Sequence, residues 1–113
     1  MLPGMLDRGS GAVVTVGGIP AVTPITGISG LGPAMAATRN FVAGLHGEVK
    51  DLGVYAGMVF LGGVVDGSAA LRHEMAHGKL PSGFPILNPG DIAAEIWTMI
   101  AERSRVELIL PRA

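Results

Sequence analysis

The sequence of 113 residues contains no cysteine, and only 15% of its residues are charged. The absence of cysteine excludes a disulfide scaffold, a thiolate nucleophile and a zinc site built on cysteine. Globular proteins average about 25% charged residues, and here 8 basic and 9 acidic residues leave a net charge of −1. With no basic patch to neutralise phosphates, we expect no nucleic-acid partner.

Charge is also absent from long stretches, since residues 9–38 include no Asp, Glu, Lys or Arg. A run of this length could cross a membrane as a helix. The run contains seven glycines and three prolines, however, and a backbone that they interrupt is not tolerated in lipid. The N-terminus also lacks the basic and apolar segments of a signal peptide. We therefore expect a cytoplasmic protein with no membrane partner and with much apolar surface to cover.

Apolar runs rich in β-branched residues predict three strands, at Gly11–Val16, Val54–Leu61 and Arg105–Leu110. Helices are expected at Pro33–Asp51, with Pro33 first and Gly53 ending the helix, at Ser68–His77, and after Asn88. Residues 19–30 are expected to form a loop. This alternation predicts the α/β fold class, with one domain over residues 1–113, a parallel sheet of three strands, flanking helices and right-handed crossovers.

Two of the predicted helices have apolar stripes at helical spacing. The inner stripe of the first is expected to consist of Met35, Thr38, Val42, Leu45 and Val49, and that of the last of Ile92, Ile96, Met99 and Ile100. A second stripe on the first helix contains only small residues and would let another backbone approach closely: Ala36, Asn40, Ala43 and Gly47.

Five segments, in their order and spacing, resemble the second half of a short-chain dehydrogenase/reductase: Arg8–Gly18, Ala36–Leu45, Gly53–Gly62, Asn88–Trp97 and Val106–Arg112. Met1–Asp7 would then be the end of the family's middle helix. The resemblance implies a Rossmann-like fold, an oxidoreductase family and NAD or NADP as the cofactor. It covers nearly the whole chain, which reads as a fragment of that fold.

The chain departs from the family at the positions that carry its chemistry. The glycine-rich dinucleotide fingerprint is absent, and the family's catalytic Ser, Tyr and Lys align with Gly18, Leu31 and Met35. These residues have no titratable group for acid–base catalysis, and the only tyrosine, Tyr55, lies in a predicted strand. We therefore expect an inactive pseudoenzyme that binds no cofactor by itself.

Gly62 and Val64 occupy the turn that meets the nicotinamide in the family. They are candidate cofactor-binding residues only if the missing half is supplied. The other interpretation is a simple turn at the end of a strand.

Two alternative functions remain open from the sequence. His73-Glu74-x-x-His77 matches the zinc-hydrolase motif in which two histidines bind the metal and the glutamate activates water. The third ligand would have to be Glu95, Asp91 or His46. The competing interpretation is a solvated helix in a loop.

The other alternative is a structural or interaction subunit, because half a sheet leaves a strand edge and a helix layer uncovered. The resemblance implies a homo-oligomer that associates through residues 33–50 and 92–110. Trp97 is then expected either in the core or at a subunit interface.

Overall fold

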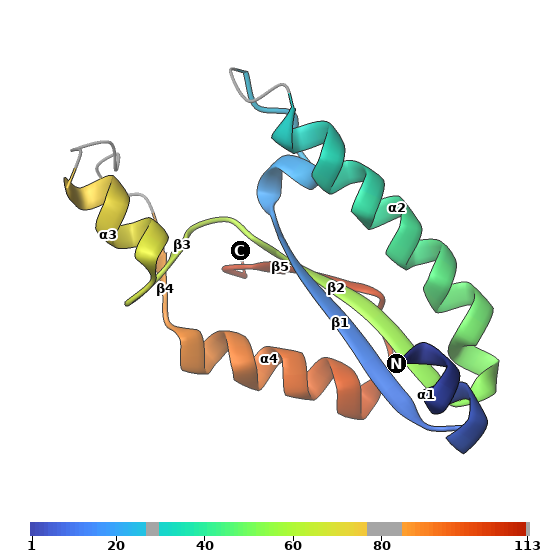
Figure 1. Ribbon diagram of the computed structural model, residues 1–113. Coiled ribbons are helices and arrows are strands. Elements are labelled where there is room, and N and C mark those ends of the chain that lie inside the picture. The colour runs from blue at the N-terminus through green and yellow to red at the C-terminus, as the bar shows by residue number, and fades with distance from the viewer. Residues whose placement is uncertain (27–29, 77–84, 113) are drawn as a thin grey trace.

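A parallel sheet of three strands forms the middle layer of the protein (Figure 1). The computed structural model describes residues 1–26, 30–76 and 85–112. The strands are β1 (Gly11–Gly18), β2 (Val54–Leu61) and β5 (Glu107–Leu110), in the order β1-β2-β5. Gly18 is paired with Leu61, and Leu61 with Leu110, so the carboxyl ends of all three strands are level. The predicted α/β class and three-stranded parallel sheet are confirmed.

Helices cover both faces of this sheet. Alternate residues of β2 point to opposite faces, and each set packs against a different helix. Tyr55 and Val59 pack against α4 (Pro89–Glu102). Met58 and Phe60 pack against α2 (Leu31–Val49). Residues 54–60 are all buried, as expected for a parallel strand that is covered on two sides.

The strand β1, in contrast, has one edge to which no described strand is paired. Val16 on this strand is 50% exposed, although it stands beside Val59, which is 0% exposed. The helix α1 (Leu2–Arg8) packs near the start of β1, through Leu2 and Met5. The expected helix at the N-terminus is therefore present, while no strand of the described residues pairs with the outer edge of β1.

The two main crossovers have opposite hands, which corrects the expectation that both are right-handed. The strands step in one direction from β1 to β2 to β5, but α2 and α4 lie on opposite faces (Figure 1). Two connections that step to the next strand in the same direction, but pass over opposite faces of the sheet, have opposite hands. The β1–α2–β2 unit is right-handed (Figure 1), so the longer connection from β2 to β5 is the rare left-handed case.

Several local expectations need correction. The segment expected to be a loop contains a 3-10 helix, η1 (Ile19–Ala21). The helix α2 begins at Leu31, so Pro33 is its third residue, which is tolerated because the first turn has unpaired N–H groups. Gly53 does stop the helical segment, in a left-handed conformation after η2 (Lys50–Leu52).

The inner stripe of α2 also differs from the expectation at one position. Thr38 is exposed, and its hydroxyl donates to the carbonyl of Ala34 at 3.1 Å. Arg39 takes the inward place instead, with its guanidinium on Glu107 of β5 at 2.6 and 3.1 Å. The predicted stripe of α4 is confirmed, since Ile92 and Met99 are buried and Ile96 and Ile100 pack beside them.

A second, two-stranded parallel sheet was not predicted. It pairs β3 (Val64–Val65) with β4 (Ile86–Leu87) beside the short helix α3 (Ala69–Ala76). Strands of two residues are too short to produce a recognisable pattern in the sequence. In the described part of the chain, no helix combines the length and the apolar character that crossing a membrane requires.

Candidate functional site at the carboxyl ends of the strands

The carboxyl ends of parallel strands are where open α/β sheets bind ligands, and the aligned residues lie there. Gly18 is the last residue of β1, and Gly62 follows the last residue of β2. Leu31 and Met35 lie one helical turn apart at the start of α2. The fold thus positions the residues that the sequence comparison singled out at one end of the sheet.

The structure places the side chain of Met35 beside Gly18, where a larger residue would touch it. A β-carbon at Gly18 would lie 3.4 Å from both the Sδ and the Cε atoms of Met35. Met35 in turn packs against the buried cluster that contains Met58 and Phe60. Leu31 is 52% exposed. None of these three side chains carries a proton that it could transfer, and Met35, which the sequence comparison aligns with the family's lysine, contributes packing.

The turn after β2 is closed by the chain's own backbone. The amide N–H of Gly62 donates to the carbonyl of Leu110 at 2.6 Å, and that of Val64 donates to the carbonyl of Pro85 at 3.0 Å. A β-carbon at Gly63 would lie only 2.5 Å from the same carbonyl of Pro85. The glycines therefore allow β5 and the segment before β4 to approach closely, and both candidate amide donors are already engaged.

This arrangement does not fit a dinucleotide without rearrangement. A nicotinamide amide at Val64 would have to displace the carbonyl of Pro85 from its hydrogen bond. Within residues 1–26, 30–76 and 85–112, no strand leads directly into an α-helix through a glycine-rich turn, the arrangement that cradles a pyrophosphate. The assignment of Gly62 and Val64 to cofactor binding stays a prediction that needs a further half of the fold.

Solved structures have the same arrangement of elements. ElxO with NADP bound matches with a TM-score of 0.77 and 18% identity, over 96% of this chain and 47% of ElxO. A short-chain dehydrogenase from Streptomyces avermitilis matches with a TM-score of 0.77 and 25% identity, over 96% of this chain and 45% of that one. The chain has the fold of part of a short-chain dehydrogenase. It spans about half the length of the structures it matches.

A third match concerns catalysis directly. It is an NADPH-bound short-chain oxidoreductase from Pseudomonas aeruginosa PAO1 that contains an atypical catalytic center, with a TM-score of 0.71 and 20% identity over 99% of this chain and 49% of that one. No model of a known protein family matches the sequence, and no curated protein matches it. The resemblance to short-chain dehydrogenases is thus confirmed through the three-dimensional structure.

Tyr55, the one tyrosine of the sequence, lies far from the candidate site. It lies near the start of β2, away from the carboxyl ends of the strands. Its ring is buried, and its hydroxyl donates to the carbonyl of Arg105 at 2.8 Å. Burial raises the pKa of this hydroxyl, while the positive charge of Arg105 acts in the opposite direction. Tyr55 therefore ties the segment before β5 to β2.

The zinc motif receives no support from the described residues. His73 lies on α3 and is exposed, whereas His77 lies outside the described residues. Of the candidate third ligands, His46 donates from Nδ1 to the carbonyl of Ala56 at 2.9 Å, and Glu95 is paired with Arg112. Across the ranges that the structure describes, no three His, Asp or Glu residues are grouped so as to hold a metal.

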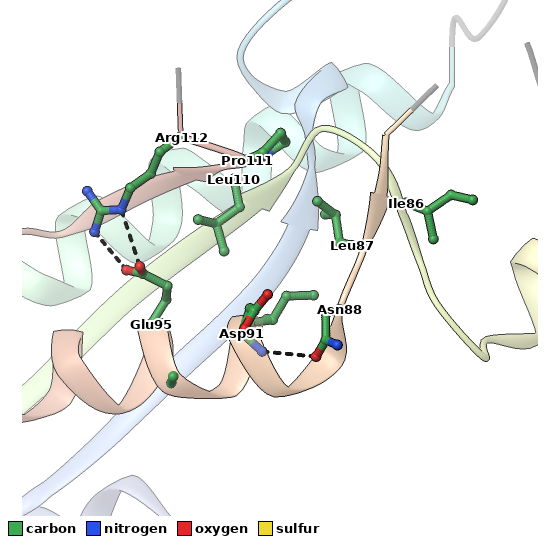
Figure 2. A pocket seen from close by; sticks show the side chains of 10 residues that line it. Ile86, Leu87, Asn88, Asp91, Glu95, Leu110, Pro111 and Arg112 are labelled. Atoms are coloured by element: carbon green, nitrogen blue, oxygen red, sulfur yellow. Dashed lines mark hydrogen bonds and ion pairs between the residues drawn. The ribbon is translucent and has the colours of Figure 1, made fainter. Parts of the chain in front are cut away.

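The structure also has a pocket of about 470 Å³ that sequence reasoning missed (Figure 2). Its apolar wall is formed by Leu87, Ile92 and Leu110, and polar residues line its rim. Arg112 donates to both carboxylate oxygens of Glu95, at 3.2 and 2.7 Å. This hydrogen bonding holds the pKa of Glu95 below its ordinary value. Because Glu95 stays ionised and paired, it is poorly suited to act as a general acid.

A second pocket of about 370 Å³ lies between the segment after β1 and the first turns of α2. All eight lining residues are apolar: Pro20, Ala21, Val22, Pro24, Ile25, Gly32, Pro33 and Ala36. Among the described residues that line it there is no polar side chain that could orient or activate a reacting group. It suits an apolar occupant.

Proposed function

We propose that this chain is a short-chain dehydrogenase-like module that does not transfer hydride by itself. The observation that carries the proposal is that Gly18 and Met35 lie side by side at the carboxyl end of the sheet, at positions that align with the family's serine and lysine. With Leu31 at the tyrosine position, no side chain there can protonate a carbonyl oxygen. The amides of Gly62 and Val64 are engaged within the chain, so neither is a free donor to a nicotinamide.

The proposed relationship to short-chain dehydrogenases implies NAD or NADP as the cofactor. ElxO and the Pseudomonas oxidoreductase are NADP- and NADPH-bound, respectively. Since this chain spans about half of each, we propose that a dinucleotide binds only when the remaining half of the fold is present.

Hydride transfer and cofactor binding should be measured separately on the purified chain. We expect no oxidation of NADH or NADPH with a panel of aldehydes and ketones, and no retention of either cofactor in equilibrium dialysis. Turnover above the rate without protein would contradict the proposal. If NADPH binds without turnover, the triple variant Gly18→Ser, Leu31→Tyr and Met35→Lys tests whether the missing acid–base groups are the cause, because it should then gain activity.

A second role, as an interaction subunit, is favoured by the exposed surface. The chain exposes 6924 Å², whereas a compact monomer of its mass, 11.5 kDa, is expected to expose about 5,800 Å². The difference of roughly 1,100 Å² is comparable to the ~800 Å² that each partner buries in an ordinary interface. Phe41 on α2 and Trp97 on α4 are 69% and 70% exposed.

We therefore propose a homo-oligomer that uses residues 33–50, residues 92–110 or both. Light scattering during size-exclusion chromatography at micromolar concentration should give a mass of at least two chains. A monomeric mass throughout this range would contradict the interaction role, and it would leave the proposal on hydride transfer untouched.

A further inference from the structure

We propose that two copies of the chain pair through the outer edge of β1 in antiparallel orientation, so that their two sheets join into one continuous sheet. The inference rests on the interaction role proposed above. It assigns the contact to a strand that lies outside residues 33–50 and 92–110, the segments to which that role was given. The observation that carries it is the lack of any protection at this edge of the sheet.

The two edges of the sheet differ in character. The edge strand β5 has four residues. Its Glu107 is bound by Arg39, and Arg105 and Pro111 flank the strand. Short length, charge and proline all keep an edge strand from pairing with another chain. The edge strand β1 has eight residues with neither a charge nor a proline, and its Val16 is 50% exposed. We expect such an edge to be covered by another strand.

The hydrogen bonds of β2 identify the backbone groups at this edge. The amide of Met58 donates to the carbonyl of Val106 at 2.8 Å, so the backbone groups of Met58 point toward β5. Those of the next residue, Val59, therefore point toward β1, where Val16 stands beside it. In a parallel pair a residue bonds to the neighbours of the residue beside it. The N–H and C=O groups of Val16 are thus left for the outer edge.

The same alternation gives four edge residues: Ala12, Val14, Val16 and Gly18. Antiparallel strands join through residues of this kind, and each facing pair exchanges two hydrogen bonds. When a two-fold axis passes through Thr15, Ala12 lies opposite the partner's Gly18, and Val14 lies opposite the partner's Val16. All four edge residues of each copy are then paired.

The side chains agree with this register. On the face that α4 covers, Val14 packs against the buried cluster that contains Val59, and the register places it beside the partner's Val16. A valine thereby covers the most exposed side chain of β1. On the other face, Thr15 meets the partner's Thr15. Pairs of β-branched residues and pairs of threonines across antiparallel strands are stabilising.

A second copy is the occupant that fits best. The strand is its own complement in this register, and the contact closes at two copies because both use the same surface. The uncharged run over residues 9–38 means that no like charges meet across the edge. The exposed surface exceeds that of a compact monomer by roughly 1,100 Å², which is enough for an interface that buries ~800 Å² of each partner.

The absence of cysteine allows a cross-linking test with matched variants. At the proposed axis, the Cα atoms of Thr15 and its counterpart would lie about 4.5 Å apart, within the ~7 Å that a disulfide spans. Thr38 on α2 and Thr98 on α4 are exposed and belong to residues 33–50 and 92–110. Under mild oxidation Thr15→Cys should form a disulfide-linked dimer, whereas Thr38→Cys and Thr98→Cys should stay monomeric on a non-reducing gel.

A charge placed on the edge tests the contact without any cross-link. Val16→Lys introduces the residue that commonly guards edge strands, and its ammonium group reaches water in the single chain. We expect the Kd of the dimer, measured by sedimentation equilibrium, to rise at least tenfold. The matched control is Ile109→Lys on β5, at a side chain that is 44% exposed, and it should leave the Kd unchanged. Circular dichroism checks that both variants are folded.

Amide hydrogen exchange reports the edge itself. When it is followed by NMR above and below the Kd, the amides of Ala12, Val14 and Val16 should exchange slowly in the dimer and fast in the monomer. The amides of Val13 and Thr15 point toward β2 and should exchange slowly at both concentrations.

The failures of this inference and of the interaction role are distinguishable. A disulfide from Thr38→Cys or Thr98→Cys, without one from Thr15→Cys, would place the contact on a helix, and only this inference would fail. An unchanged Kd for Val16→Lys, or fast exchange at the edge within the dimer, would overturn it in the same way. A monomer at every concentration would refute both the interaction role and this inference.

Discussion

Removing the hydroxyl group of Tyr55 should destabilise the protein by about 1 kcal/mol, because a buried hydrogen bond contributes about 0.5–1.5 kcal/mol. The ring is 2% exposed, and its hydroxyl donates to the carbonyl of Arg105 at 2.8 Å, 50 residues away in the sequence. In Tyr55→Phe the ring keeps its packing, including its edge contact with His46 at 5.8 Å. Only the carbonyl of Arg105 loses a partner. For a chain of this size the melting temperature should fall by about 4 °C.

The same hydroxyl predicts how stability depends on alkaline pH. Burial raises the pKa of Tyr55 above its ordinary value of 10.0, so the folded protein holds this proton more tightly than the unfolded chain does. The stabilisation is fully present below pH 10 and is lost as the pH rises through the pKa of the folded state. Tyr55→Phe lacks this group. Above pH 10 the free energy of unfolding should therefore fall more steeply for the unmodified protein than for the variant.

The assay is simple because the chain has one tyrosine. The near-ultraviolet absorbance of tyrosinate then reports Tyr55 alone, in the folded protein and in urea. Urea titrations of both proteins at matched pH give the free energies of unfolding, and Tyr55→Ala provides a reference for losing the whole ring, at about 3–5 kcal/mol. The reasoning would be refuted if the folded protein titrated at the same pH as the unfolded chain, or if Tyr55→Phe were as stable as the original at neutral pH.

Two further predictions concern residues in the left-handed backbone region. Gly67→Ala should cost about 1 kcal/mol of unfolding free energy from its φ of +75° alone, since a β-carbon there meets nothing within 4 Å. Gly53→Ala, at a similar φ of +82°, should cost about 1–3 kcal/mol more because its β-carbon would overlap the carbonyl of Gly9, and equal costs in urea denaturation would contradict this. Arg103 has a φ of 54°, and its guanidinium donates to the carbonyls of Ile100, Gly53 and Gly11. Both Arg103→Ala and Arg103→Gly should be less stable than the original, with the glycine variant the more stable of the two by about 1 kcal/mol, and thermal melts that reverse this order would argue against it.

The start of α4 shows what local sequence signals can predict. A helix was expected to start after Asn88, and the structure has the Oδ1 atom of Asn88 accepting from the amides of Gly90 and Asp91 at 2.7 and 3.3 Å, as a helix cap. Both amides lie within three residues of the cap, so the signal and the structure share one short segment. The strand β2 was equally predictable, because a continuous apolar run between glycines is typical of a doubly covered parallel strand.

The inner side of α2 shows where local sequence signals fail, because Arg39 faces inward in place of the expected Thr38. Helical periodicity ranks Thr38 as the better inner residue, since arginine is rarely buried. Glu107 reverses this order, but it lies 68 residues further along the chain. The pocket in Figure 2 was missed for the same reason, because Glu95 and Arg112 meet across 17 residues.

The sequence by itself determined the alternation of strands and helices, the uncharged run over residues 9–38, and the absence of titratable groups at Gly18, Leu31 and Met35. These follow from propensities and side-chain chemistry that act within a few residues. Only the tertiary structure decided that α4 covers the face opposite α2, that Met35 lies beside Gly18, and that the amides of Gly62 and Val64 are already bound. These properties depend on contacts between segments far apart in the chain, which local patterns do not encode.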